Sequence, residues 1–371
     1  MKVPLLDLVA QYGAIKDDVL PALLQVVESQ QFIMGPAVAQ LETEIARLSR
    51  ARHGIGCASG TDALLLPLKA LNLRPGDEVI TTAFTFFASA GAVHNAGGTP
   101  VFADIEPETF NIDAAAVERA ITPRTRALIP VDLFGQMANL ERLLALAEPR
   151  GIAVIEDACQ AIGARRRIGG AWRMAGELSW VASYSFFPSK NLGAWGDGGM
   201  MVTSDDQTAE RLRRLRLHGG AKQYHHDEVG TNSRLDTLQA AVLLAKLPQL
   251  AAWSARRREH AAYYTAALRD VPQVRTPVVD PANEHIFHQY TLRVERRDEL
   301  QARLTSEGIG HAIYYPVPLH RQPCFAHLDY GPGSLPETER AAREVISLPI
   351  YPELTRAQLD RVIDVIRGCY R

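Results

Sequence analysis

The chain has 371 residues, enough for one large α/β unit or for two domains whose core needs no disulfide support. Forty basic and 42 acidic side chains give a net charge of −2, so composition provides no broad electrostatic attraction to nucleic acid or to a membrane surface. The four cysteines lie far apart without a Cys-x-x-Cys pair, which argues against a zinc site and a disulfide framework and fits a reducing cytoplasm.

The first 50 residues show helical periodicity in two segments, 14–29 and 37–50, with a turn between them at 32–36. The N-terminus lacks the apolar core of a signal peptide. No apolar run approaches the roughly 20 residues that a membrane-spanning helix requires. We therefore expect a cytoplasmic protein that is neither secreted nor inserted into a membrane.

From residue 54 the pattern changes to short apolar strands that alternate with longer helical segments. Seven strands are expected, at 55–58, 78–81, 100–104, 127–131, 153–157, 180–186 and 200–203. Such alternation is typical of an α/β fold with a mostly parallel sheet that is covered by helices on both faces. In these sheets, ligands bind at the carboxyl ends of the strands.

Beyond residue 205 the chain is mostly helical and then returns to an α/β pattern. The expected helices lie at 236–247, 251–268, 297–307, 337–345 and 359–366, and the expected strands at 289–294 and 311–315. We place a boundary near residue 250, between a large domain (1–250) and a smaller C-terminal α/β domain (251–371).

One segment after the first expected strand has the features of an anion site. Residues 54–63 run from strand into helix through glycines, with the hydroxyls of Ser59 and Thr61 near the helix start. Backbone N–H groups at a helix N-terminus attract phosphate. The glycine spacing nearly matches the dinucleotide fingerprint, but the last glycine comes one residue too late. A phosphate cradle and an ordinary Ser/Thr helix cap both remain open as interpretations.

Asp157 ends an otherwise apolar strand, so its carboxylate is expected at the ligand-binding edge of the sheet. There it could keep the ring nitrogen of a cofactor protonated, which makes pyridoxal phosphate (PLP) an electron sink, or it could be a structural cap. Phe84 and Phe86 follow another strand and could offer a ring face to a flat cofactor, although core packing would also explain such a pair.

Lys190 lies between an apolar strand and the glycine turn at 196–199, where a bulky ligand could approach the backbone. A buried or half-buried lysine amine is the group that forms a Schiff base with a carbonyl, including that of PLP. A lysine that snorkels to solvent from a strand end is the other interpretation.

Two further polar clusters are weaker candidates. His225 and His226 are adjacent and lack a third ligand at a suitable spacing, so no metal site is expected. Arg234 could pair with a phosphate or a carboxylate of a ligand, or with Asp236 at a helix start.

Taken together and in order, these segments resemble the DegT/StrS-type family of PLP-dependent nucleotide-sugar aminotransferases over nearly the whole chain. The matching segments are 60–63 (Gly-Thr-Asp-Ala), 75–79 (Pro-Gly-Asp-Glu-Val), 156–160 (Glu-Asp-Ala-Cys-Gln), 185–190 (Ser-Phe-Phe-Pro-Ser-Lys), 196–199 (Gly-Asp-Gly-Gly), 230–236 (Gly-Thr-Asn-Ser-Arg-Leu-Asp) and 315–320 (Tyr-Pro-Val-Pro-Leu-His). Each segment alone is a weak signal, but the ordered set is highly specific.

The resemblance implies the aspartate aminotransferase fold (fold type I) in a homodimer, with PLP bound at the subunit interface. By position, Lys190 matches the Schiff-base lysine and Asp157 matches the partner of the pyridine nitrogen. The other positions that match cofactor contacts are Gly60, Thr61, Phe86, Gln160 and Ser185, together with Asn232, which matches a phosphate contact made from the neighbouring subunit. The positions that match the sugar pocket are His218, Arg234, Tyr314, Tyr315 and His320, although some relatives have histidine where Tyr314 stands.

The implied reaction has two half-reactions at one site. An amino acid, expected to be L-glutamate, donates its amino group, and a UDP- or dTDP-linked ketosugar nucleotide receives it for aminosugar biosynthesis. The residues at 232–236 are more similar to those of enzymes that aminate C3 of the hexose than to those of enzymes that aminate C4. A branch of the family with histidine in place of the lysine catalyses dehydration, and Lys190 argues against that branch. An NAD(P)-dependent sugar oxidoreductase and a PLP-bound regulatory protein without turnover remain the alternatives.

Overall fold

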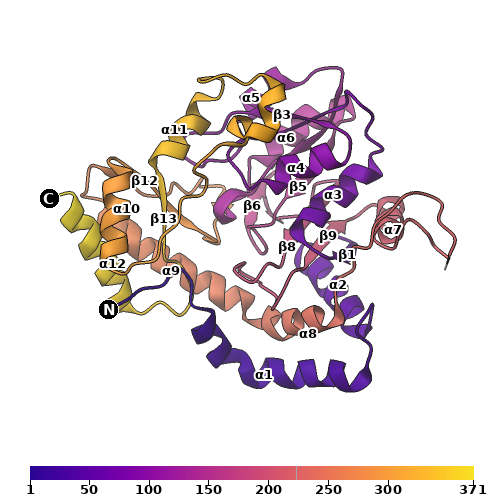
Figure 1. Cartoon of the computed structure of the whole chain (residues 1–371), viewed down its shortest axis with the longest axis horizontal. Helices are drawn as coiled ribbons and strands as arrows, with labels where there is room; N and C mark the ends of the chain where they lie inside the picture. The colour runs from indigo at the N-terminus through magenta and orange to yellow at the C-terminus, as the bar shows by residue number, and fades with distance from the viewer. Residues whose placement is uncertain (223) are drawn as a thin grey trace.

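The computed structural model describes residues 1–222 and 224–371. At its centre is a seven-stranded sheet with the order β1-β9-β8-β5-β4-β2-β3 (Figure 1). The strands are β1 (His53–Cys57), β2 (Glu78–Thr82), β3 (Thr99–Ala103), β4 (Thr125–Ile129), β5 (Ala153–Asp157), β8 (Val181–Ser185) and β9 (Gly199–Thr203). The pairs from β8 through β3 are parallel, whereas β9 runs against both of its neighbours, β8 and β1. The expected mostly parallel seven-stranded sheet is confirmed.

The strands are apolar at nearly every position because helices cover both faces of the sheet. Successive residues of one strand enter different cores: Val154 belongs to the core on one face and Ile155 to the core on the other. The helices of the first face are α2 (Pro36–Leu48), α5 (Ala114–Ala120), α6 (Leu140–Ala147) and α8 (Thr237–Lys246). Those of the second face are α3 (Gly60–Ala70), α4 (Ala88–Asn95) and α7 (Asp206–Leu215).

The first helix, α1 (Leu8–Ser29), lies outside these layers and runs beside α8 (Figure 1). It begins earlier than the expected 14–29 because Asp7 caps it, accepting a hydrogen bond from the Ala10 N–H (2.9 Å). Neither α1 nor any other helix within residues 1–222 and 224–371 has the length and apolar character needed to cross a membrane.

The C-terminal part of the chain builds a second, smaller antiparallel sheet. It consists of β10 (Val274–Arg275), β12 (Tyr290–Val294) and β13 (Val345–Leu348). The helices that share its core are α9 (Leu250–Leu268), α10 (Arg297–Ser306) and α12 (Arg356–Cys369), and α11 (Pro336–Glu344) leads into β13. Val3 also packs in this core and forms an isolated bridge with Ile309, which brings the two ends of the chain to the same side of the molecule (Figure 1).

We propose a domain boundary near residue 250, where α9 begins. Residues 1–250 contain every strand of the large sheet, and residues 251–371 contain every strand of the smaller sheet. The N-terminal residues around Val3 contribute to the second core despite their place in the chain.

The prediction of a strand at 311–315 is wrong. Within this segment Ala312 alone pairs with another strand, through an isolated bridge to Ser347. The chain then reaches Pro316 and Pro318, which lack the N–H that sheet pairing requires. Tyr314 and Tyr315 of this segment line a cavity described below.

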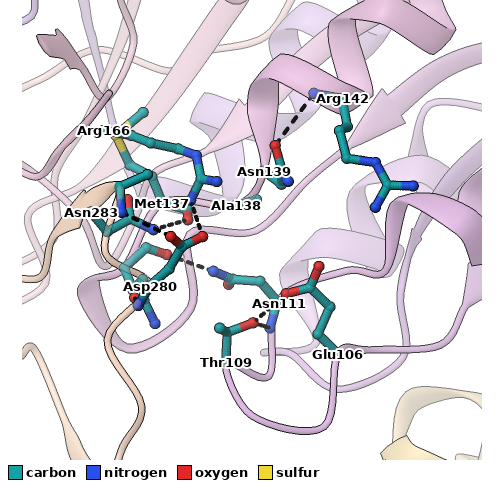
Figure 2. Close-up of polar contacts among 12 residues, drawn as sticks. Glu106, Thr109, Asn111, Met137, Ala138, Asn139, Arg142, Arg166, Asp280 and Asn283 are labelled. Carbon is teal, nitrogen blue, oxygen red and sulfur yellow. Dashed lines mark hydrogen bonds and ion pairs between the residues drawn. The ribbon is translucent and has the colours of Figure 1, made fainter. Parts of the chain in front are cut away.

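A polar junction ties the C-terminal half of the chain to the large domain. A hairpin of β6 (Arg165–Ile168) and β7 (Ala171–Met174) is extended by the short strand β11 (Asn283–Glu284). From β6, Arg166 Nη1 donates to Asp280 Oδ2 (2.7 Å), and from β11, Asn283 Nδ2 donates to the backbone oxygen of Met137 (3.0 Å), as Figure 2 shows. We call these four residues the 280 junction. Because the chain runs on from the junction to residues 286–289, the junction helps to set the position of that segment.

Removing the acidic member of the Arg166–Asp280 pair is expected to destabilise the protein strongly. Arg166 is only 6% exposed, so Asp280→Ala leaves a buried charge without its partner and costs about 3 kcal/mol in the free energy of unfolding. The matched control is Glu284→Ala, because Glu284 pairs with the more exposed Arg165 and Arg258 and its loss should cost less than about 1 kcal/mol. Urea unfolding measures both values, and equal losses would contradict this account.

Candidate active site

A cavity of about 440 Å³ opens at the carboxyl edge of the large sheet. Asp157 ends β5 and Lys190 follows β8, and these two strands are parallel neighbours, so their ends meet at the same edge. The candidates from the sequence that line the cavity are Gly60, Thr61, Phe86, Asp157, Gln160, Ser185, Lys190, Tyr314 and Tyr315.

The start of α3 forms one end of the cavity. Ser59 caps this helix, since its hydroxyl accepts a hydrogen bond from the Asp62 N–H (3.1 Å). At Gly60 a Cβ atom would lie 2.6 Å from the Cβ of Ser185, so a larger residue does not fit without movement. Bare helix N-terminal backbone therefore stands beside the hydroxyl-bearing residues Thr61 and Ser185, an arrangement suited to an anion such as phosphate.

The Asp157 carboxylate is held in place by two hydrogen bonds. Its Oδ2 accepts from the Ser89 hydroxyl (2.7 Å), and its Oδ1 accepts from the Cys159 N–H (3.3 Å). The residue is 5% exposed and faces the cavity. A fixed carboxylate in such a place favours a cationic ring nitrogen as its partner.

Two further carboxyl groups, those of Asp132 and Glu156, lie next to Asp157. The Asp132 N–H donates to the Asp157 backbone oxygen (3.0 Å), and Glu156 directly precedes Asp157. Burial raises the pKa of both Asp132 and Glu156, and the neighbouring Glu156 charge raises the pKa of Asp132 further. The Glu156 carboxylate accepts from the Gly176 N–H (3.0 Å) and the Ser179 hydroxyl (2.9 Å), so we infer that Asp132 holds the proton shared by the two.

Lys190 enters the cavity from the loop after β8. Its backbone N–H donates to the Phe187 oxygen (2.8 Å), which closes the turn that carries it. Burial lowers the pKa of its amine, and the negative charge of Asp157 opposes that shift. A desolvated lysine amine loses its proton more easily than a solvated one, which suits a nucleophile and a base.

Gln160 and Tyr315 are fixed against each other on another wall. Gln160 Oε1 accepts from the Phe134 N–H (2.8 Å), and its Nε2 donates to the Tyr315 hydroxyl oxygen (3.1 Å). Tyr315 packs edge-on against Phe84, and burial raises the pKa of its phenol, which stays neutral. Phe86 lies at the mouth of the cavity with 58% of its surface exposed, so one of its faces is free to cover a ligand.

Four of the candidates from the sequence do not reach this cavity. His218 and Arg234 line a second hollow, on the loop that follows α7. Asn232 is exposed on the same loop, where it forms an isolated bridge with Leu217. His320 is buried and its Nε2 lies 3.3 Å from a glutamate oxygen of α11.

Two residues of the site were missed by the sequence analysis. One is Ser89, whose hydroxyl holds the Asp157 carboxylate. Like Phe86, it follows the parallel strand β2, and this position could have marked Ser89 as a candidate. His288 lines the cavity too, but no local pattern indicates it, because residues 286–289 reach the site only through contacts made by distant parts of the chain. One such contact is the Ile286 N–H donating to the Gly135 oxygen (3.0 Å).

The polar and aromatic groups that line this cavity fit PLP. The helix start and its hydroxyls suit the phosphate, the Asp157 carboxylate suits the pyridine nitrogen, and Phe86 has an exposed ring for the flat heterocycle. Lys190 supplies an amine of lowered pKa for the aldehyde.

Comparison with known proteins adds an independent observation. A family model described as the DegT/DnrJ/EryC1/StrS aminotransferase family matches residues 14–367. A pleiotropic regulatory protein of Geobacillus stearothermophilus is 52% identical, covering 100% of this chain and 99% of its own. A UDP-N-acetyl-3-dehydro-alpha-D-glucosamine 3-aminotransferase of Acidithiobacillus ferrooxidans is 45% identical, covering 98% and 97%. The crystal structure of Streptomyces venezuelae DesV with a ketimine intermediate superimposes with a TM-score of 0.96 at 45% identity, covering 100% and 99%.

Asp132→Asn is expected to make the protein more stable at alkaline pH. The raised pKa of Asp132 means that the folded chain keeps a proton which the unfolded chain releases, so stability falls as the pH rises above the pKa of a free aspartate. Asparagine removes this loss, while its oxygen can still accept from the Ala138 N–H as Asp132 does (2.9 Å). We expect a gain of about 1 kcal/mol or more at pH 8 and a smaller one at pH 5.

Melting temperatures at the two pH values measure the effect. Asp132→Ala is the control, since it loses the acceptor for Ala138 and should be destabilised at both values. An Asp132→Asn variant with the same pH dependence as the unaltered protein would show that Asp132 is not protonated.

Proposed function

Because this chain belongs to the DegT/DnrJ/EryC1/StrS aminotransferase family, we propose that it moves the amino group of L-glutamate to C3 of a ketosugar nucleotide. Members of this family depend on PLP, and the chain is a PLP-dependent aminotransferase of fold type I. The choice of C3 is supported by the Acidithiobacillus ferrooxidans relative, whose name describes a 3-aminotransferase of a UDP-linked sugar. Both UDP- and dTDP-linked ketosugars are candidate substrates.

This proposal rests above all on one observation: Lys190 and Asp157 line the same cavity, beside the start of α3. A nicotinamide-dependent oxidoreductase does not attach its cofactor through a lysine amine. A transaminase needs such an amine beside a carboxylate and an anion site.

When bound, PLP supplies an electron sink for the negative charge that develops on a substrate carbon. The Lys190 amine first anchors the cofactor, and once released it takes a proton from the α-carbon of the amino donor. In the second half-reaction the same Nζ returns a proton to the sugar carbon that receives the amino group. The lowered pKa of Lys190 serves both tasks, because it increases the share of unprotonated amine at a given pH.

The other residues of the site bind the cofactor and orient it. We assign the phosphate to the backbone of Gly60 and the hydroxyls of Thr61 and Ser185, and the cationic ring nitrogen to Asp157. Phe86 would cover the ring of PLP, and Gln160 would bind its phenolic oxygen. Tyr314 and Tyr315 line the cavity where the sugar would enter.

Three of the remaining assigned residues act, in this proposal, from a neighbouring subunit. Asn232, His218 and Arg234 do not line the cavity of their own chain. Their loop also carries Tyr224 and Val229, which are 90% and 86% exposed. Large apolar side chains that are exposed to this degree favour a protein interface, and we infer a homodimer in which each loop completes the partner's site. His320 then acts indirectly, through the packing behind the sugar pocket.

The regulatory name of the Geobacillus stearothermophilus relative supports a second candidate, a PLP-bound regulatory protein without turnover. Such a protein would keep the contacts to PLP and fail to process a ketosugar. Turnover is therefore the property that separates the two candidates.

The purified protein is expected to transfer ¹⁵N from labelled L-glutamate to a nucleotide-linked 3-ketohexose. Mass spectrometry of the sugar product over a panel of UDP- and dTDP-linked 3-keto and 4-keto substrates measures the transfer and its position. Lys190→Ala should reduce the rate by at least about a hundredfold, because both the anchor and the proton carrier are lost. Binding of PLP without transfer to any member of the panel would favour the regulatory protein.

Two inactive variants are expected to restore activity when their subunits exchange. Lys190→Ala removes the amine, and Asn232→Asp places a negative charge where the partner's cofactor phosphate would lie. A mixed dimer combines one doubly altered site with one intact site, so an equal mixture should recover about a quarter of the full rate. A double variant on one chain, mixed with itself, is the control and stays inactive. No recovery in a mixture whose mixed dimers are verified by mass would contradict the shared site.

A further inference from the structure

A second buried lysine contacts the loop that carries Lys190. Lys246, at the end of α8, is 1% exposed, and burial lowers the pKa of its amine to about 8. Within the part of the chain that the structure describes, no carboxylate offsets this effect. A buried amine without an acidic partner is costly, and nothing in the function proposed above uses it. Its contacts should therefore show what it does.

The Lys246 amine makes its hydrogen bond and its aromatic contact with this one loop. Its Nζ donates to the backbone oxygen of Gly193 (2.7 Å) and lies 5.9 Å from the centre of the Trp195 ring, within reach of a cation–π contact. Gly193 is buried, and Lys246 is the donor that satisfies its carbonyl oxygen. Without this donor the oxygen would be a buried acceptor without a partner.

The loop itself is closed, so its far side is coupled to Lys190. The Ala194 N–H donates back to the Phe186 oxygen (2.8 Å), at the start of the loop. At Gly193 a Cβ atom would lie 2.3 Å from the Pro188 oxygen, which shows that the two sides of the loop are in contact. A shift of Gly193 therefore moves the segment just before Lys190 as well.

Gln239 supports the same loop from the same face of α8. Seven residues, or about two helical turns, separate Gln239 from Lys246, so their side chains leave the helix on one side. The Gln239 Oε1 accepts from the Trp195 N–H (2.9 Å). At Gly196 a Cβ atom would lie 3.0 Å from the Gln239 Nε2, so the glutamine also packs closely against the glycine turn. Helix α8 thus holds the loop at Gly193 and again at Trp195.

We propose that Lys246 is a positioning residue for Lys190: with Gln239 it holds the loop that presents the reacting amine to the cavity. This inference rests on the proposed role of Lys190 as that amine. Neither Lys246 nor Gln239 lines the cavity, so both act through the backbone of the loop. Their helix is a firm support, because Ala240 and Leu243 pack in the core of the first face. Lysine suits the task, since its amine can donate in both the charged and the neutral form.

Hydrogen exchange of the purified protein measures the loop directly. The reporters are the amides of Lys190 and Ala194, which both donate to backbone oxygens of the loop. In Lys246→Met we expect these two amides to exchange about tenfold faster, as for the loss of one hydrogen bond that keeps the loop closed. The amides of β5 and β8 should keep their rates. Gln239→Leu should act in the same sense, because it removes the acceptor for the Trp195 N–H.

Two results would overturn the proposal: unchanged exchange at both reporters in either variant, or an equal acceleration throughout the large sheet. The second result would mean that Lys246 only stabilises the fold. Lys69→Met is the matched control, because Lys69 also stands in the last turn of a helix, α3. Its side chain makes no hydrogen bond to the loop among the described residues, so both reporters should exchange at the unaltered rate. A matching acceleration in this control would also count against the proposal.

The ketosugar reaction supplies a second readout. In Lys246→Met we expect kcat to fall about five- to tenfold, because the reacting amine is less often in place. The KM for the sugar nucleotide should not change, since Lys246 does not line the cavity. A raised KM with an unaltered kcat would contradict a role in positioning Lys190. Hydrogen exchange can be measured whether or not the protein converts a ketosugar, so failure of this inference and failure of the proposed function are distinguishable.

Discussion

The constraint on which the site depends is that a lysine amine has to be kept out of water beside a carboxylate. Burial alone lowers the pKa of Lys190, and the nearby charge of Asp157 acts against that shift. These two opposing effects on the pKa of Lys190 depend on where the Asp157 carboxylate lies. Hydrogen bonds from Ser89 and Cys159 hold that carboxylate in place. Behind this layer the proton shared by Asp132 and Glu156 prevents two further negative charges from accumulating in the interior.

The fold meets this constraint through the geometry of parallel strands. Strands β5 and β8 end at the same edge, so the residues that follow them approach each other without a long excursion of the chain. Helix α3 begins at that edge too and offers its N-terminal backbone. The 280 junction then brings residues 286–289 from the C-terminal half of the chain to close the cavity on one side.

Local signals explain what could be predicted from the sequence. Asp157 ends an apolar strand and Lys190 lies in the loop after another, and the carboxyl ends of parallel strands meet at one edge of the sheet. The pairing of Asp132 with Glu156 and the place of His288 depend on distant contacts, for which a single sequence carries no signal. The strand predicted at 311–315 is wrong because only Ala312 pairs with β13 before the chain reaches Pro316 and Pro318, which lack the N–H that sheet pairing requires.

The measurement that tests the central claim most directly is the site at which PLP attaches to the protein. Reduction of the holoprotein with borohydride, followed by digestion and peptide mass spectrometry, fixes the cofactor to the amine that holds it. The account predicts a pyridoxyl-phosphate adduct on Lys190, and none in Lys190→Ala. An adduct on another lysine, or a protein that retains PLP and remains unmodified, would contradict it.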